Sequence, residues 1–255
     1  MSGPVSGRVS ARDTAVAAKG PIGDLGGSWM SSDLEEAASA AAGLDDWQLY
    51  FLGRHGVLGD VHPEVVRAAA YVFPVERIAD QWDAARAVMT PEEATQSYLA
   101  VCHQWARERL AGFAGADRLS ELGLRVVEAV DIVAMPLLAG WRALELPKEA
   151  DASAERCGQV CQLLREHRGA CHGVALAALN LPPLTAILTN VGGEANAVDY
   201  GWRPPFATPG DADRALRDRV EVLTDEIAAV AYEALSADEQ AELLTLLNAA
   251  HAHAS

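Results

Sequence analysis

Leu163-Leu164-Arg165-Glu166-His167-Arg168-Gly169-Ala170-Cys171-His172 is the stretch that decides the predicted fold, and it places two arginines and two histidines within ten residues. We expect a helix over about residues 151–167, a turn at Gly169, and a further short helix over about residues 173–179. Such a turn would bring Arg165, Arg168 and His172 together. The stretch is therefore both a structural landmark and the first candidate for a functional site.

The composition of the chain favours a folded, acidic protein. The chain has 255 residues, half of them hydrophobic, which is enough for one large domain or two small ones with a substantial core. The formal net charge is −16, and the only lysines are Lys19 and Lys148. Proteins gain much of their affinity for DNA by neutralising phosphates with basic side chains. The charge therefore argues against DNA as a partner.

The sequence carries no segment that predicts export or membrane insertion. Residues 1–30 lack the apolar run of a signal peptide, and the longest apolar-rich run, residues 126–141, is too short to cross a bilayer. Four cysteines in a chain of this length do not form a disulfide framework. We therefore expect a cytoplasmic protein with reduced thiols and no membrane partner.

Helical patterns cover most of the chain, and strand patterns are nearly absent. We expect an all-α fold with at most a short hairpin within residues 197–207. The most apolar segment, residues 117–144, is expected to be one long helix that is kinked before Pro136.

Three parts of the chain differ in composition. Residues 1–31 are rich in Gly, Ser and Ala without periodicity, and we expect a flexible N-terminal arm. The break at Leu146-Pro147-Lys148 separates an N-terminal helical half, residues 32–146, from a C-terminal half, residues 147–255. We predict one helical unit for each half.

The two halves share an order of motifs. Residues 51–56 are similar to residues 164–169, and Trp82 and Trp202 hold equivalent places before a Thr-Pro helix start. Two related halves would bury apolar surface against each other as the subunits of a homodimer do. We therefore predict an internal duplication, present either as a monomer with a pseudo-two-fold axis or as a homodimer.

Two groups of motifs carry a likeness to a known family. They are residues 164–169 with His172, Leu179 and residues 223–228 in the second half, and Trp47, residues 50–51, residues 53–54 and residues 58–61 in the first. On these motifs the chain resembles an actinobacterial helix-turn-helix family that is itself distantly similar to MarR regulators. The resemblance implies a winged-helix-derived α fold over about residues 32–250, and it carries no activity. Residues 200–209 are short and proline-rich where the family has a wing, so a degenerate wing is expected.

If the resemblance extended to function, residues 182–191 would be the recognition helix. A recognition helix reads the major groove with Arg, Lys, Asn or Gln side chains. No Lys or Arg occurs between Gly169 and Trp202, and residues 182–189 are mainly apolar. The segment is more typical of a helix that contacts a core or a ligand, which again argues against DNA binding.

Arginine and histidine side chains are the best candidates for a functional site. A guanidinium can bind a carboxylate, phosphate or enolate oxygen, and an imidazole titrates near neutral pH. Should the protein be an enzyme, we predict His55, His172 and Arg165 as its catalytic residues. The predicted ligand-binding residues are Tyr50, Arg54, Trp82, Arg168 and Trp202.

Several of these residues also have a purely structural interpretation. A basic side chain at a helix C-terminus interacts favourably with the helix dipole, which would explain Arg168. Trp82 and Trp202 are core residues unless they wall a shared pocket. Glu128 and Asp131, three residues apart, are either an acid–base pair or, as we prefer, part of a polar stripe.

A metal site is a weaker hypothesis. Cys157 and Cys161, four residues apart on one helix, could join Cys171, His172 or His167 around zinc. The spacing does not match an established zinc pattern, and small buried cysteines are common. No nucleophile motif, phosphate loop or cofactor fingerprint is present. We therefore expect neither a metal nor a cofactor.

Three functions are compatible with these patterns. We favour a small-molecule-binding protein on a MarR-like scaffold with weakened or lost DNA binding, whose ligand lies in an apolar, aromatic pocket with Arg and His as polar groups. The first alternative is an enzyme in the same pocket that uses His for proton transfer and Arg for an oxyanion. The second alternative is a MarR-type transcriptional regulator.

Overall fold

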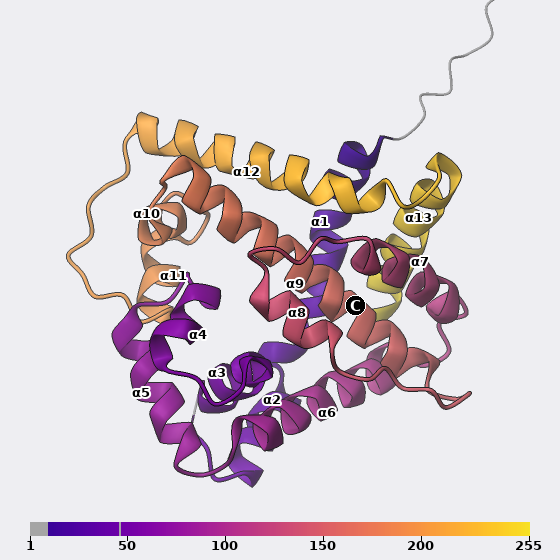
Figure 1. Cartoon of the computed structure of the whole chain (residues 1–255), viewed down its shortest axis with the longest axis horizontal. Coiled ribbons are helices and arrows are strands. Elements are labelled where there is room, and N and C mark those ends of the chain that lie inside the picture. Colours follow the sequence, from indigo (N-terminus) through magenta and orange to yellow (C-terminus); the bar gives the residue numbers. More distant parts are fainter. Residues whose placement is uncertain (1–9, 46) are drawn as a thin grey trace, which may run out of the picture.

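One long helix, α9, crosses the centre of the computed structural model, and α1, α6, α7, α8 and α12 pack against it (Figure 1). The structure describes residues 10–45 and 47–255, and it contains no strand within them. The predicted all-α fold is therefore confirmed. The helices are α1 (Ala11–Gly27), η1 (Ser28–Ser31), α2 (Asp33–Ala41), α3 (Gln48–His55), η2 (Gly56–Leu58), α4 (Pro63–Ala69), α5 (Val75–Arg86), α6 (Pro91–Arg109), α7 (Ala116–Glu128), α8 (Pro136–Arg142), α9 (Ser153–Leu179), α10 (Pro183–Leu188), α11 (Gly193–Asp199), α12 (Asp211–Tyr232) and α13 (Ala237–Ala254).

α9 is one unbroken helix of 27 residues, so the predicted turn at Gly169 is wrong. A glycine inside a helix costs roughly 1 kcal/mol relative to alanine, and packing of α9 against α1, α6, α7, α8 and α12 outweighs that cost. The Tyr71 hydroxyl donates a 2.8 Å hydrogen bond to the carbonyl oxygen of Gly169. A Cβ at Gly173 would lie 2.8 Å from Tyr71 Cε1. Gly173 therefore allows a close helix contact, and these glycines do not end α9.

The predicted flexible arm is wrong for residues 10–31, because most of them form the buried helix α1 and the short helix η1. α1 begins with a capping box at Ser10 and packs on α9, α12 and α13. A Cβ at Gly26 would lie 2.6 Å from the carbonyl oxygen of Cys161. The small residues therefore allow two helices to pack closely. Residues 1–9, the rest of the predicted arm, lie outside the described residues.

The segment predicted as one helix over residues 117–144 is two helices. α7 ends at Glu128 and α8 begins at Pro136. Proline has no backbone N–H and disfavours a helical residue before it. Met135 accordingly has φ −123° and ψ 57°, and Ala134 lies in the left-handed region with φ 61°. Pro136 therefore starts a helix instead of kinking one.

The segment expected to hold a degenerate wing has no hairpin. α11 covers its start and ends at Asp199, and an irregular connection over residues 200–210 then leads to α12. The predicted recognition helix over residues 182–191 is reduced to α10, which has six residues. A helix this short presents less than two turns to any groove.

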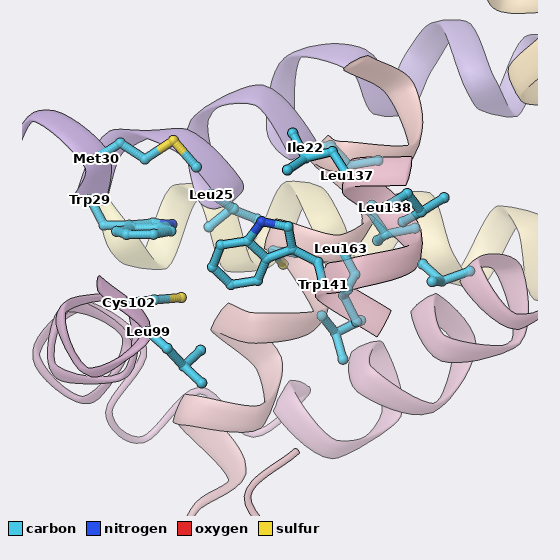
Figure 2. Close-up of a cluster of buried hydrophobic side chains, with 14 of the residues drawn as sticks. Ile22, Leu25, Trp29, Met30, Leu99, Cys102, Leu137, Leu138, Trp141 and Leu163 are labelled. Atoms are coloured by element: carbon cyan, nitrogen blue, oxygen red, sulfur yellow. The ribbon is translucent and has the colours of Figure 1, made fainter. Parts of the chain in front are cut away.

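The largest core lies around Trp141 of α8, where side chains of α1, α6 and α9 meet (Figure 2). Trp141 is fully buried, and its Nε1 donates a 3.0 Å hydrogen bond to the carbonyl oxygen of Arg54. This bond fixes the end of α3 against α8. The same core includes side chains from α1 to α13, so both predicted halves contribute to it. The division at residue 146 and the duplication stay predictions.

Two expectations about the chemistry of the chain can be compared with the structure. The four cysteines are buried and form no disulfide, as predicted. Within residues 10–45 and 47–255, no helix is both long enough and apolar enough to span a bilayer.

Candidate functional site

A cleft with a volume of about 1420 Å³ runs along one face of α9. Residues three or four apart on a helix share a face, and this face of α9 carries a charged end followed by an apolar end. The other walls come from α1, α3, α8 and the segments that follow α4 and α11. The cleft residues at this spacing on α9 and just after it are Arg165, Arg168, His172, Leu176 and Asn180.

Aromatic side chains line much of the remaining surface of the cleft. Trp47 and Tyr50 come from the start of α3, Tyr71 and Phe73 from the segment after α4, and Tyr200 follows α11. The ring centroids of Phe73 and Tyr200 are 5.2 Å apart, and those of Trp47 and Phe73 are 5.6 Å apart. These contacts lie in the range of favourable ring pairs. The cleft therefore offers rigid apolar surface beside charged groups.

The first charged group on α9 is a buried ion pair between Arg54 and Glu166. Arg54 Nε and Nη2 donate to the two Glu166 carboxylate oxygens at 2.9 and 3.0 Å, and Arg54 Nη1 donates to the Tyr50 hydroxyl at 2.6 Å. Arg165 adds a 3.3 Å contact to the same carboxylate. Burial acts to raise the pKa of Glu166, but the charges of Arg54 and Arg165 outweigh it and hold that pKa below its usual value. Glu166 is therefore a carboxylate that fixes Arg54 in place.

The second charged group lies about one turn further along α9, around Glu221 of α12. Arg168, His172 and Arg217 place nitrogen atoms 3.6, 3.8 and 3.5 Å from its carboxylate oxygens, and Lys19 of α1 also pairs with it. Burial acts to raise the pKa of Glu221, but the hydrogen bond and charge of Lys19 and the charges of its other basic neighbours lower it. Three helices therefore meet at one carboxylate.

Arg168 is only partly satisfied by this arrangement. Its Nη2 lies 2.8 Å from Asp225, and the charge pair connects α9 to α12. Its Nη1 is buried and has no hydrogen-bond partner among the described residues. An unpaired buried donor of a charged group costs on the order of 1–3 kcal/mol or more. Arg168 therefore lines the cleft and keeps an unused donor that is shielded from solvent.

His172 is held at its inner nitrogen. Its Nδ1 lies 3.1 Å from the hydroxyl oxygen of Thr224, and the ring centroid lies 6.4 Å from that of Tyr71. Burial lowers the pKa of His172, and the nearby Glu221 carboxylate offsets only part of this effect. The imidazole is therefore mainly neutral at pH 7.

Five of the eight predicted site residues line the cleft. The structure divides these residues between the two charged groups. Arg54 meets Arg165 through Glu166, whereas Arg168 and His172 belong to the group around Glu221. The five residues are Tyr50, Arg54, Arg165, Arg168 and His172.

The other three predicted residues lie away from the cleft. His55 is fully buried, with Nδ1 3.0 Å from the Phe51 carbonyl oxygen, and burial lowers its pKa to about 3. A histidine this deep cannot reach a ligand in the cleft. Trp82 Nε1 donates to the Val61 carbonyl oxygen, and Trp202 Nε1 donates at 2.9 Å to that of Val72. Trp82 connects α5 to the segment before α4, Trp202 connects two segments outside the helices, and neither tryptophan lines the pocket.

Sequence reasoning missed the acidic partners and one aromatic wall. Glu166 was not among the predicted site residues, because nothing in the local sequence pairs it with Arg54. In a continuous helix, Glu166 lies on the same face as Gln162, four positions earlier, whose amide donates to Glu166 at 2.8 Å. This face is turned toward Arg54 of α3. Glu221 has no local signal, since its partners come from α1, α9 and its own helix. Its role depends on tertiary structure.

No metal centre emerges from the described residues, among which no three His, Cys, Asp or Glu side chains are placed to hold an ion. Cys157 and Cys161 are fully buried beside Cys102. A hydrogen bond that the Cys161 thiol donates to Cys157, together with burial, raises the pKa of Cys161, and burial raises that of Cys102. The thiols of Cys161 and Cys102 therefore stay protonated inside the core.

Comparison with known proteins places this architecture in a family. Residues 28–206 match the model of a helix-turn-helix family, which is more than half of the chain. The chain belongs to this helix-turn-helix family. No curated protein and no solved structure matches it.

The matched residues cover only part of the cleft. They include Arg54, Glu166, Arg168 and His172, and thus the helix-turn-helix family match contains the whole first charged group. α1, α12 and α13 lie outside the match, and with them Glu221 and the basic Lys19 that pairs with it. The second charged group therefore joins the family region to helices that flank it.

Proposed function

We propose that this protein binds a small organic anion with an apolar body in the cleft along α9. The single observation that carries the proposal is the face of α9 itself. Its charged end presents Arg165, Arg168 and His172, and its apolar end presents Leu176 beside the aromatic walls. Ligand sites combine apolar surface with a few placed polar groups in this way. A cleft of about 1420 Å³ is ample for a drug-sized molecule.

The charge of the second group supports an anionic ligand. Lys19, Arg168 and Arg217 carry three positive charges, and the facing carboxylates of Glu221 and Asp225 carry two negative ones. The excess is positive although the chain as a whole carries −16. Charge-assisted hydrogen bonds to a carboxylate or phosphate are among the stronger polar contacts in proteins. Arg168 lines the cleft and has an unpaired Nη1, which is shielded from solvent, so a ligand would contact it only after the side chain shifts.

Native mass spectrometry of the freshly purified protein tests the proposal directly. A non-covalent adduct that is lost on denaturation supports a bound ligand and gives its mass. The fluorescent anion anilinonaphthalene sulfonate provides a second test, because it combines an apolar ring system with one negative charge. Arg168→Gln should weaken its binding about tenfold or more, and Arg109→Gln, an exposed control, should leave it unchanged. Equal binding by both variants and the parent would contradict the proposed site.

DNA binding as a transcriptional regulator is the second candidate, and membership of the helix-turn-helix family favours it. Charge opposes it. α10 and α11 contain no Lys or Arg, and α5 carries Arg77 and Arg86 against Glu76, Asp80 and Asp83. Without basic side chains these helices lose the phosphate contacts that supply most affinity. We infer that DNA binding is weakened or lost on a scaffold that we place near the MarR regulators.

A salt titration separates the two candidates. A regulator should bind duplex DNA with an affinity that falls steeply as salt rises, since each phosphate contact releases counterions. We expect no such binding at physiological salt. Tight, salt-sensitive binding to one duplex over a scrambled one would favour the regulator instead.

An enzyme in the same cleft is the remaining alternative, and the neutral state of His172 favours it. A neutral imidazole near a guanidinium can accept a proton while the positive charge stabilises an oxyanion. If the protein turns over a bound compound, and His172→Gln abolishes the turnover but not the binding, the protein is an enzyme.

A further inference from the structure

The hydrogen bonds of Thr224 determine which nitrogen of His172 carries the proton. The Thr224 hydroxyl donates its single proton to the Val220 carbonyl oxygen at 2.8 Å. Its oxygen can then only accept, so the 3.1 Å contact to His172 Nδ1 requires that Nδ1 be the donor. The Glu221 carboxylate, 3.8 Å from the same nitrogen, also favours a proton there. The tautomer with a proton on Nδ1 leaves a free lone pair on Nε2.

The free Nε2 is available to a ligand. Thr224 is fully buried, so Nδ1 faces the interior, while the His172 side chain is 27% exposed and lines the cleft. In residues 10–45 and 47–255 nothing is hydrogen-bonded to Nε2. The charged groups around the ring are Glu221 and the basic side chains of Arg168, Lys19 and Arg217. The ring is thus a fixed hydrogen-bond acceptor in an otherwise donor-rich part of the cleft.

A donor and an acceptor therefore stand one helical turn apart on α9. Arg168 supplies the unpaired Nη1, and His172 supplies Nε2, with about 6 Å between their positions along the helix axis. A ligand that satisfies both needs an acidic group close to a hydrogen-bond donor. Tyr71 lies beside them, because its hydroxyl binds the Gly169 carbonyl and its ring packs near His172. An apolar substituent next to the two polar groups would contact this ring.

We propose that the cleft takes a hydroxy acid, with its carboxylate on Arg168 and its hydroxyl donating to Nε2 of His172. The inference rests on the anion-binding function proposed above and adds the chemical class of the ligand. A hydroxyl fits better than an ammonium group as the donor, because Arg168, Lys19 and Arg217 already give this region an excess of positive charge. His172 is then the residue that distinguishes a hydroxy acid from the plain acid.

Two matched acids test the inference by isothermal titration calorimetry. Mandelate and phenylacetate are both aromatic monoanions and differ by one hydroxyl next to the carboxylate. We expect the protein to bind mandelate about tenfold more tightly, which is the value of one hydrogen bond to a placed acceptor. Phenylglycine, which carries an ammonium group in place of the hydroxyl, should bind more weakly than mandelate.

Two substitutions of Thr224 test the role of the fixed tautomer. Thr224→Val keeps the shape of the side chain but removes its hydroxyl. This variant should therefore bind mandelate and phenylacetate with nearly equal affinity. Thr224→Ser keeps the hydroxyl and should keep the preference. Nitrogen-15 NMR of the His172 ring should show the proton on Nδ1 in the parent and in Thr224→Ser, and a mixture of tautomers in Thr224→Val. This spectrum needs no ligand and also confirms that each variant is folded.

The outcomes separate the two proposals. Equal affinity for mandelate and phenylacetate, each weakened by Arg168→Gln, overturns the hydroxy-acid inference and leaves the anion-binding function standing. A proton on Nε2 in the parent spectrum overturns the inference as well. If neither acid and no anilinonaphthalene sulfonate binds, both proposals are overturned.

Discussion

The two charged groups on α9 contain the same kinds of residue and differ in how fully they are satisfied. In the first, Arg54 and Glu166 are nearly buried, at 12% and 2% side-chain exposure, and each guanidinium nitrogen of Arg54 has a hydrogen-bond partner. In the second, Arg168 keeps an unpaired donor and His172 a free acceptor. A complete set of partners indicates a structural role, and unused polar atoms at a cleft indicate a ligand. Residue type alone does not separate the two.

The largest expected effect is on the first group. Arg54→Met should lower the free energy of unfolding by about 3–5 kcal/mol, because it leaves the Glu166 carboxylate buried without its main partner. The double variant Arg54→Met/Glu166→Leu should recover much of this loss, since neither charge then remains. Urea unfolding measures the free energy of unfolding of the single and the double variant. A control in the exposed pair of Arg67 and Glu64, Glu64→Gln, should change stability by less than about 1 kcal/mol.

The buried histidines and the cleft histidine should also differ in how they respond to acid. Burial lowers the pKa of His55 to about 3 and that of His167 to about 4, so both stay neutral in the folded protein at pH 5. In the unfolded chain they protonate as pH falls through about 6.5, and the folded state then loses stability. Between pH 6.5 and pH 5 each should cost about 2 kcal/mol of unfolding free energy.

Denaturant titrations at several pH values check this expectation. His55→Gln should flatten the dependence of stability on pH over this window. In the same protein, NMR should show His172 protonating at a higher pH than His55, because it is partly exposed and faces Glu221. If His172 instead protonates at a lower pH than His55, the contrast between the buried histidines and the cleft histidine is contradicted.

A smaller effect is expected from Glu221, which holds the second group together. Glu221→Gln removes one negative charge from the cleft and frees Arg168, Lys19 and Arg217 from their shared partner. Binding of anilinonaphthalene sulfonate should strengthen several-fold, while thermal stability falls slightly. Glu226→Gln, an exposed change on the same helix, is the matched control. Weaker binding in Glu221→Gln would mean that this carboxylate contacts the ligand.

The sequence predicted the local features of this fold better than its long-range contacts. The capping boxes at Thr90 and Ser236 follow from neighbouring residues, and both helices begin there. α1 was missed because the glycines at its end, Gly26 and Gly27, are explained only by the α9 atoms that pack against them. The same holds for the site. Arg168 and His172 could be chosen by residue type, whereas Glu221 and the orientation set by Thr224 come from another helix.

The smallest predicted effect concerns Gly169, which lies between Arg168 and His172 on α9. A Cβ at Gly169 would meet no atom within 4 Å, whereas one at Gly173 would lie 2.8 Å from the Tyr71 ring. Gly169→Ala should therefore stabilise the protein by about 0.5–1 kcal/mol, since alanine favours a helix without a clash. Gly173→Ala should destabilise it by about 1–3 kcal/mol, because Tyr71 has to move.

The pair also tests whether α9 is one rigid element. Thermal unfolding gives the two stabilities, and calorimetry with mandelate gives the two affinities. Gly169→Ala adds a methyl group at the cleft wall beside Arg168, so it should weaken mandelate binding slightly while the protein becomes more stable. Loss of stability in Gly169→Ala would instead mean that α9 needs a flexible point at this residue. Arg168 and His172 would then lie on separate segments whose relative position can change.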